Sequence, residues 1–317
     1  MKILLVTSSL EEILKPNVIA LGNFDGIHQG HQQVLKSTFN QDFLDSISSN
    51  TPIYSTVVTF TPHPREFFTG EKKQLLTPLN EKVKLLEKLG INQLLLLPFD
   101  RELASLTPQK FTENILIDRI DACLISVGKD FRFGHQRKGN AQDLKQIASS
   151  KGIKVIISQE QTLTLKNQQN IRISSSYIRI CLEKGDVETA NQMLGYKYSL
   201  TGKVIEGQKL GRAIGFPTAN LQLPTDKFLP RFGVYAVKVY KEHNPNMTLK
   251  GVMNIGCRPT VAGKQTTVEV HLLNWSGDLY NQVLTLELER FLRPEQKFSS
   301  LDALKQQISN DCVLANL

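Results

Sequence analysis

Two histidines, His28 and His31, flank Gly30 in the stretch VIALGNFDGIHQGHQQVLKS (residues 18–37), where an apolar run gives way to a helical pattern. A helix N-terminus favours anions, and glycines let a phosphate approach the backbone closely. Two imidazoles there supply directional N–H donors for the charge that grows on phosphate oxygens in phosphoryl or nucleotidyl transfer. The structural alternative is that one histidine caps the helix and the other binds a metal or packs in the core. Because the sequence lacks G-x-x-x-x-G-K-S/T, a P-loop fold is disfavoured.

The residues around this turn predict an open parallel sheet flanked by helices. Apolar, β-branched runs without polar alternation are typical of strands that are covered on both faces. Such runs lie at residues 17–21, 53–60, 91–99, 121–127 and 152–158. Gly22 ends the first run, and ligands of an open parallel sheet bind at the carboxyl ends of its strands. The loop from Asn23 to Gly26 is therefore placed at a binding edge.

Two helices of this half have recognisable signals. The helix after the histidines carries an apolar side chain at every fourth position, namely at Leu35, Phe39, Phe43 and Ile47. A second helix is expected to have Thr77 as its cap, Pro78 in its first position and Gly90 as its terminator. Its apolar stripe consists of Val83, Leu86 and Leu89.

From about Tyr196, after a helical pair around residues 176–195, the sequence predicts an antiparallel barrel or sandwich. Gly and Pro turns separate the expected strands, at residues 198–207, 233–240, 248–256, 266–273 and 282–291. A terminal helix is capped by Ser299 or Ser300 and carries one apolar face, made of Leu301, Leu304 and Ile308. Because 317 residues exceed the usual size of one compact core, we expect two domains, 1–195 and 196–317.

Composition narrows the classes of partner. The formal net charge of +8 attracts polyanions in general, but no arginine-rich tract, zinc-finger spacing or RNA-binding aromatic stripe accompanies it, so we expect no nucleic-acid partner. The four cysteines lack C-x-x-C spacing, which predicts reduced, structural thiols at Cys123, Cys181, Cys257 and Cys312. No apolar stretch approaches a membrane span, so we expect a cytoplasmic protein with no membrane partner. The oligomeric state is left open.

The string GNFDGIHQGH resembles the nucleotide-binding motif of the adenylyltransferase superfamily, and its extended form is similar to that of bacterial FAD synthetases. Three further strings occur in the order of that family: TFTPHPREFF (59–68), SVGKDFRFGHQRKGN (126–140) and RISSSYIR (172–179). The last resembles I-S-S-T-x-I-R, with Ser176 where threonine is usual. Since serine keeps the hydroxyl, we expect phosphate binding to survive.

The resemblance implies a Rossmann-like α/β domain in which Ser175 and Ser176 hold ATP phosphates and Arg179 neutralises them. The nucleotide-binding residues that it implies in the first motif are Gly22, Asn23, Phe24, Asp25 and Gly30. It places FMN and ATP near the loop at Asp130, and the expected flavin-binding residues are Asn23, Asp25, Asp130, Phe131 and Arg132. Read alone, these strings also fit a helix cap with a surface arginine, aromatic packing around Phe133, and a rigid turn at His63.

In the second half, GKVIEGQKLGRAIGFPTANL (residues 202–221) resembles the riboflavin kinase motif. Its glycines allow a loop to wrap tightly around phosphates, and two cations add charge; the residues are Gly207, Gly211, Gly215, Lys209 and Arg212. Thr218 and Asn220 project to one side of an extended segment and offer hard oxygen ligands. The resemblance implies that they hold Mg²⁺ on ATP. The alternative is a glycine-rich turn with an edge-strand proline, Pro217.

Two later strings, GVMNIGCRPTV and TTVEVHLLNWSGDLY, also follow the kinase pattern, and Glu269 falls where the resemblance places the catalytic base. A carboxylate suits this role because the 5′-hydroxyl of riboflavin must lose its proton as it attacks the γ-phosphorus. Alternation also permits Glu269 to face solvent while Val268 and Val270 point inward.

The resemblance covers nearly the whole chain and implies a bifunctional riboflavin kinase and FMN adenylyltransferase, with ATP, riboflavin and FMN as substrates. In the adenylyl transfer, His28, His31 and Arg179 are expected to stabilise charge. One alternative is a nucleotidyltransferase for another phosphorylated substrate, although the GFPTAN segment argues against it. Another is a flavin- or RNA-binding regulator without turnover, which does not need Asn220, Glu269 and both histidines.

Overall fold

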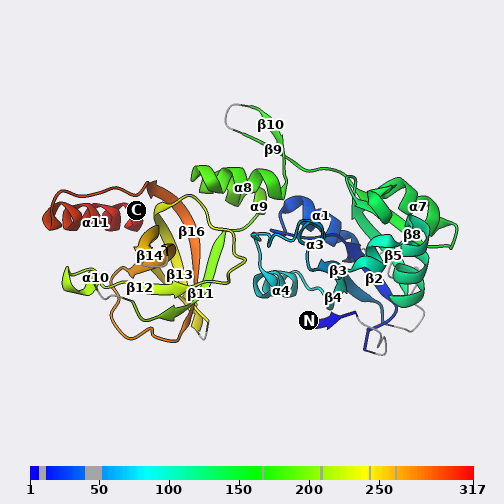
Figure 1. Cartoon of the computed structure of the whole chain (residues 1–317), viewed down its shortest axis with the longest axis horizontal. Helices are drawn as coiled ribbons and strands as arrows, with labels where there is room; N and C mark the ends of the chain where they lie inside the picture. The colour runs from blue at the N-terminus through cyan, green and yellow to red at the C-terminus, as the bar shows by residue number, and fades with distance from the viewer. Residues whose placement is uncertain (7–11, 40–51, 166–167, 208–209, 243, 261–262) are drawn as a thin grey trace. The chain divides into compact units, whose positions relative to one another are not determined.

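The computed structural model describes two compact units, Met1–Ser174 and Ser175–Leu317. The described residues are 1–6, 12–39, 52–165, 168–207, 210–242, 244–260 and 263–317. Figure 1 shows that helices flank a sheet in the first unit, and that the strands of the second curl around a common interior. Both parts therefore have the architecture that the sequence predicts.

The first unit is built on a six-stranded sheet in the order β1-β4-β3-β2-β5-β8, and each neighbouring pair is parallel. The strands are β1 (Lys2–Leu5), β2 (Asn17–Leu21), β3 (Tyr54–Thr61), β4 (Gln93–Pro98), β5 (Ala122–Gly128) and β8 (Lys154–Ser158). The predicted parallel sheet is confirmed. The edge strand β1 was not expected, because its four residues are too few for a clear periodic signal.

Helices cover both faces of this sheet. They are α1 (Gln29–Lys36), a 3-10 turn (Ser37–Phe39), α3 (Pro64–Thr69), α4 (Leu79–Lys88), α5 (Arg101–Ser105), α6 (Pro108–Lys110), a π-helical segment (Phe111–Arg119) and α7 (Ala141–Ser149). Two short pairs complete the unit: β6 (Arg132–Phe133) with β7 (Gly139–Asn140), and β9 (Thr162–Thr164) with β10 (Asn170–Arg172). Ile19 and Ala20 pack in different apolar clusters, since successive residues of a strand face opposite sides.

Two helix predictions for this unit need correction. The cap of α4 is Pro78 rather than Thr77. Of the predicted stripe, Leu86 is buried and Val83 packs against the same apolar cluster, but Leu89 is 38% exposed, and the helix also buries Lys82. Gly90 follows the helix with a φ of 81°, as expected of a terminator. The helix predicted through residue 47 is described only as α1 and the 3-10 turn that follows it; of its stripe, Leu35 is buried, Phe39 is 39% exposed, and Phe43 and Ile47 lie outside the described residues.

The second unit is a closed antiparallel barrel in the order β11-β12-β15-β14-β13-β16. Its strands are β11 (Ser199–Ile205), β12 (Ala219–Gln222), β13 (Gly233–Lys241), β14 (Asn244–Thr260), β15 (Gly263–Leu272) and β16 (Val283–Arg293). Of the two predicted architectures, a barrel or a sandwich, the barrel is the one observed. Closure leaves no free sheet edge, so each strand is paired on both sides.

Two helices precede the barrel and pack with it: α8 (Ser175–Lys184) and α9 (Val187–Leu194). The buried Asn191 of α9 donates to the Leu288 carbonyl at 2.9 Å and accepts from the Tyr198 backbone N–H at 2.7 Å. These bonds attach α9 to the barrel. This agrees with a compact unit that begins at residue 175, ahead of both helices. The domain boundary predicted at residue 196 stays a prediction.

The terminal helix α11 (Leu301–Asn316) has Ser300 as its cap, and the Ser300 hydroxyl accepts from the Ala303 N–H at 3.1 Å. The expected apolar face is wrong at Leu301, which is 54% exposed. The helix instead buries Asp311, which pairs with Arg293 at the end of β16, and Ala315, which packs in an apolar cluster with Val234 and Val252.

This buried ion pair predicts a large effect on stability. Asp311 accepts from the Arg293 Nη2 at 2.7 Å and Nε at 3.0 Å, and Gln307 donates to it at 2.9 Å. Asp311→Asn is expected to lower the free energy of unfolding of the second unit by about 3 kcal/mol, because the guanidinium is left without its counter-charge. Trp275 is the only tryptophan, so its fluorescence during urea unfolding reports this unit alone. Asp302→Asn, in the exposed first turn of the same helix, is the control and should cost under about 1 kcal/mol.

Candidate active sites

The first site is the loop that follows β2 at the carboxyl edge of the sheet. Its backbone is left-handed at Phe24 (φ 48°), Gly26 (φ 91°) and Ile27 (φ 36°), and the side chains of Phe24 and Ile27 are fully buried. A left-handed conformation at bulky residues persists only where the surrounding structure holds it, and it is concentrated at functional sites.

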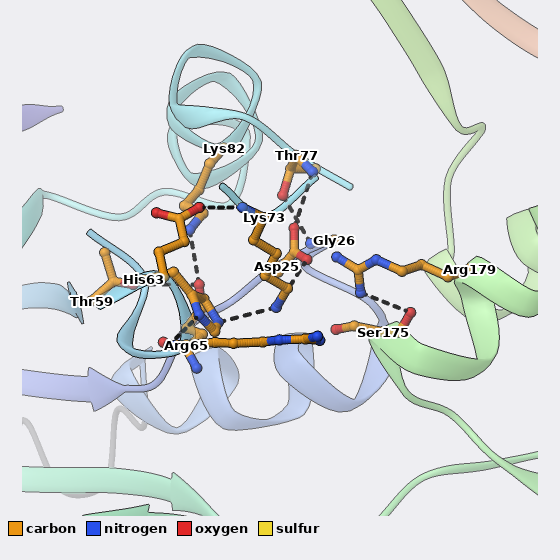
Figure 2. Close-up of polar contacts among 12 residues, drawn as sticks. Asp25, Gly26, Thr59, His63, Arg65, Lys73, Thr77, Lys82, Ser175 and Arg179 are labelled. Carbon is orange, nitrogen blue, oxygen red and sulfur yellow. Dashed lines mark hydrogen bonds and ion pairs between the residues drawn. The ribbon is translucent and has the colours of Figure 1, made fainter. Parts of the chain in front are cut away.

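Side chains from distant segments hold this loop. The Gly26 N–H donates to the Thr77 hydroxyl at 2.8 Å, and the Thr77 N–H donates to Asp25 Oδ1 at 3.3 Å. The Asn23 carbonyl accepts from Lys82 Nζ at 2.8 Å. The residue expected as a helix cap, Thr77, thus binds the motif loop instead, as Figure 2 shows.

The two motif histidines form a stack at the start of α1. Their ring centroids are 3.6 Å apart, with 16° between the planes, and Phe24 meets His31 edge-on at 5.4 Å. His28 is the cap of the helix, and its Nδ1 accepts from the His31 backbone N–H at 3.2 Å. A side chain at Gly30 would place its Cβ 3.2 Å from the His28 ring, so glycine leaves room for the stack.

Both imidazoles are neutral at neutral pH. Burial lowers the pKa of His28 to about 4, and burial together with the neighbouring His28 lowers the pKa of His31 well below its usual value. Because Nδ1 of His28 accepts a hydrogen bond, the ring hydrogen of the neutral form lies on Nε2. In the described part of the chain, Nδ1 of His31 is buried without a hydrogen-bond partner. The stack therefore offers neutral polar atoms to a ligand rather than positive charge.

Basic residues that sequence reasoning missed gather around Asp25. Asp25 is 3% exposed, with its Oδ2 4.0 Å from Lys73 Nζ, and Lys73 lies 3.1 Å from His63 Nε2. His63 caps α3 by accepting from the Arg65 N–H at 3.1 Å, so it is more than a rigid turn (Figure 2). The sequence carried no clear signal for Lys82, since a lysine directly before Val83 in a helical pattern ordinarily extends to solvent.

The loop expected near the flavin follows β5. Asp130 forms an ion pair with Arg172, which also reaches Glu160 at 3.2 Å. Phe131 stacks on the buried Phe133, with centroids 5.5 Å apart and 16° between the rings, while Arg132 is exposed. The loop thus contains the aromatic packing and the ion pair of the structural alternative, and its flavin-binding role stays a prediction.

The residues expected to bind ATP phosphates open helix α8 of the second unit. The helix begins at Ser175, and the Ser175 carbonyl accepts from Arg179 Nη1 at 3.3 Å (Figure 2). The Arg179 guanidinium also lies over the Phe228 ring at 5.5 Å, and Ser176 is exposed. Their role as phosphate ligands stays a prediction.

The barrel brings the predicted magnesium ligands and the predicted base together. Asn220 of β12 pairs in register with Glu269 of β15, and the Thr218 hydroxyl donates to Glu269 Oε2 at 3.2 Å. Val268 and Val270 are buried on the other face of the strand, as the alternation predicts. A Cβ at Gly207 would lie 2.2 Å from Asn220 Nδ2, so glycine there leaves the amide in place. The three polar side chains thus share one outer face of the barrel.

A histidine that was not predicted, His271, supports this segment. It follows Glu269 by two residues, so both lie on the same face of β15. Its Nδ1 lies 2.8 Å from the Pro217 carbonyl, and its ring meets Phe216 edge-on at 5.6 Å. The sequence signal for His271 was the alternation of apolar and polar residues along this strand, which places it on the same face as Glu269.

The remaining predicted loop residues lie around α10 (Leu210–Ala213). Arg212 is exposed, and Gly215 has a φ of 92°, a left-handed conformation that favours glycine. Lys209 lies outside the described residues. Their nucleotide-binding roles stay predictions.

Gly211 gives a direct test of this loop. A Cβ at Gly211 would lie 2.3 Å from the Phe216 carbonyl oxygen and 3.3 Å from the Thr218 hydroxyl. Gly211→Ala is therefore expected to shift the segment and lower kcat/KM for riboflavin phosphorylation about 10²-fold, the cost of a misplacement of about 1 Å. Adenylylation of supplied FMN should not change. Lys203→Ala, at an exposed position on β11 of the same barrel, serves as the control. Full kinase activity of Gly211→Ala would show that the loop is not part of the site.

Known sequences match both units. The FAD synthetase family matches residues 10–177, and the riboflavin kinase family matches residues 194–316. A bifunctional riboflavin kinase/FMN adenylyltransferase of Buchnera aphidicola subsp. Schizaphis graminum is 36% identical over 98% of this chain and 96% of its own length. The bifunctional riboflavin kinase/FMN adenylyltransferase of Escherichia coli K12 is 38% identical over 93% of this chain and 90% of its own length.

A solved structure matches the whole fold. A crystal structure from Streptococcus pneumoniae, described there as a macrolide-efflux protein, has a TM-score of 0.85 and 27% identity, and the match covers 100% of this chain and 99% of that one. The match supports the combination of a parallel sheet with a barrel. Within the described residues of the present chain, no helix has the length and apolar character needed to cross a membrane.

The fold and the matches define an enzyme with two transferase parts that act on nucleotides. The chain belongs to the bifunctional riboflavin kinase/FMN adenylyltransferase family. Its kinase activity produces FMN, and its FAD synthetase activity produces FAD.

Proposed function

We propose that Glu269 is the base of the kinase reaction. Its carboxylate takes the proton of the riboflavin 5′-hydroxyl while that oxygen bonds to the γ-phosphorus of ATP and the bond to ADP breaks. The observation that supports this most directly is the contact of Glu269 with Thr218, beside Asn220. Binding alone would not require a carboxylate next to two oxygen ligands.

Thr218 and Asn220 are the proposed magnesium ligands. Hydroxyl and amide oxygens are hard donors of the kind that Mg²⁺ accepts, together with substrate phosphates. Among the described residues, no group of three histidines, cysteines or carboxylates could hold a metal, which fits a metal bound mainly through ATP. When bound, Mg²⁺ would neutralise charge on the phosphates.

For adenylyl transfer, we propose that the histidine stack stabilises charge on the phosphates. A phosphate oxygen of FMN bonds to the α-phosphorus of ATP, and the bond to the β-phosphate breaks, releasing pyrophosphate. Because nucleophile and leaving group are both anionic, the step needs no strong base. His28, which is buried, and His31, which is partly buried, are neutral and would donate hydrogen bonds in this step. Ser175, Ser176 and Arg179 remain the proposed ligands of the ATP phosphates.

The proposal includes a cytoplasmic location and small-molecule partners only. The four cysteines are free, which agrees with a reducing compartment. ATP, riboflavin and FMN are the proposed substrates.

The test is a chromatographic time course of the purified chain with riboflavin, ATP and Mg²⁺ that separates riboflavin, FMN and FAD. FMN followed by FAD is expected. FMN without FAD, also when FMN is supplied, would exclude the proposed transferase site. A repeat with Mg²⁺ chelated should stop the kinase step, and unchanged FMN formation there would contradict the roles of Thr218 and Asn220. No conversion at all would favour a flavin-binding regulator.

A further inference from the structure

The buried lysine of α4 is the least expected charge near the first site. Lys82 is 8% exposed, although lysines on helices of globular proteins mostly face solvent. A buried ammonium is costly unless it is paired. Among the described residues, its nitrogen makes one hydrogen bond, at 2.8 Å to the Asn23 carbonyl inside the nucleotide-binding motif. The position of this charge is therefore tied to the motif loop.

Side chains from two elements donate hydrogen bonds to the Asn23 carbonyl of this loop. Besides Lys82 on α4, the Thr59 hydroxyl of β3 donates to the same oxygen at 3.4 Å (Figure 2). The next residue, Phe24, has a φ of 48° and meets His31 edge-on. A movement of the Asn23 peptide would therefore be passed through Phe24 to the histidine stack.

The charges that face Lys82 come from three segments. Asp25, in the motif loop, favours the ammonium, while Lys73, in the segment before α4, opposes it. His31, on α1, has its pKa lowered further by Lys82, which keeps that imidazole neutral. Protonated Lys82 thus compensates the buried Asp25 and holds the uncharged form of His31.

We propose that Lys82 is a positioning residue for adenylyl transfer: its ammonium, through the Asn23 carbonyl, holds the motif loop and the histidine stack in the conformation that receives the nucleotide phosphates. This inference rests on the proposed function of the first unit. Loss of the proton from Lys82 removes the charge that compensates Asp25 and weakens the charge-assisted bond to Asn23. The contacts from Thr77 and Thr59 remain, but the Asn23 peptide is held less firmly in the position that supports the histidine stack.

The inference predicts a pH dependence confined to one of the two activities. Burial lowers the pKa of Lys82 to about 8, so the ammonium is present below that pH and is lost above it. The kcat/KM for FMN adenylylation is expected to fall about tenfold per pH unit above about pH 8, since kcat/KM reports groups of the free enzyme. The second ionisation of a phosphate lies near pH 6, well below this range. Riboflavin phosphorylation by the same chain also uses ATP. The ratio of the adenylylation rate to the phosphorylation rate should therefore fall above about pH 8.

The experiment compares both activities of the full chain between pH 6.5 and 9.5 for wild type, Lys82→Met, Lys82→Arg and Lys88→Met, the last being exposed on the same helix. Lys82→Met should reduce adenylylation by about 10- to 100-fold at pH 7, and its kcat/KM should no longer fall above about pH 8. Lys82→Arg should restore much of the activity and shift the decline upward, because arginine does not titrate in this range. Lys88→Met should behave as wild type.

Several outcomes would overturn the inference. They are a wild-type profile without a decline above pH 8, a decline that persists near pH 8 in Lys82→Arg, and full activity of Lys82→Met at pH 7. The first of these outcomes is measured on the wild-type chain, so the inference can be tested even if a Lys82 variant fails to fold. A wild-type chain that makes no FAD from FMN at any pH would instead refute the proposed function itself.

Discussion

Glu269→Gln is expected to lower kcat for riboflavin phosphorylation by about 10²- to 10⁴-fold, the usual contribution of a positioned general base. Glutamine has nearly the same shape and can still accept the hydrogen bond from the Thr218 hydroxyl, which is 3.2 Å from the carboxylate. It cannot take the proton of the 5′-hydroxyl. The loss should therefore fall on kcat, with little change in KM for ATP, and FMN formation by chromatography measures it.

The control for this prediction is Glu289→Gln. Glu289 is a partly exposed glutamate on β16 of the same barrel, and its replacement should leave the kinase rate within about twofold. Adenylylation of supplied FMN should be normal in both variants. A kinase rate for Glu269→Gln near that of wild type would show that the carboxylate is only a solvent-facing residue of β15.

His31→Ala is expected to lower FMN adenylylation by about 10²- to 10³-fold, the cost of removing one preorganised donor from a developing charge. The change removes a ring that stacks on His28 at 3.6 Å and meets Phe24 edge-on, so the remaining histidine also loses its support. The conversion of FMN and ATP to FAD and pyrophosphate measures the effect.

Riboflavin phosphorylation by the same His31→Ala chain is the internal control and should be normal. Gln33→Ala, exposed on the same helix, provides the matched variant and should make FAD at the wild-type rate. If His31→Ala made FAD as fast as Gln33→Ala, the stack would have only a structural role.

The sequence predicts the strands of the parallel sheet well, because β2, β4 and β5 are apolar runs with turn residues beside them. The histidine turn is predicted from its place at a helix start, whereas Glu269 is assigned to the same site as Thr218 and Asn220 only through the resemblance to the riboflavin kinase motif, and these roles stay predictions. The strands and the histidine turn depend on residues that are close together in sequence.

The contacts that hold the first loop could not be predicted in the same way. Thr77 stands before a helix, where a cap is the ordinary expectation, yet its hydroxyl binds Gly26, 51 residues earlier. Lys82 lies beside the stripe residues Val83, which is partly buried, and Leu86, which is buried, where a lysine would ordinarily extend to solvent. Both residues act across tertiary contacts between segments far apart in the chain, which local periodicity does not encode.

The docking of α9 on the barrel through Asn191 bears on how such a chain could be divided into two genes. A kinase gene that starts at Tyr196 would discard α9 and leave the Leu288 carbonyl and the Tyr198 N–H without their partner. A gene that starts before Ser175 keeps the barrel whole, but it carries the serines and arginine predicted for adenylyl transfer away from the synthetase. Each of these cuts therefore separates either α9 from the barrel or the predicted phosphate ligands from the first unit.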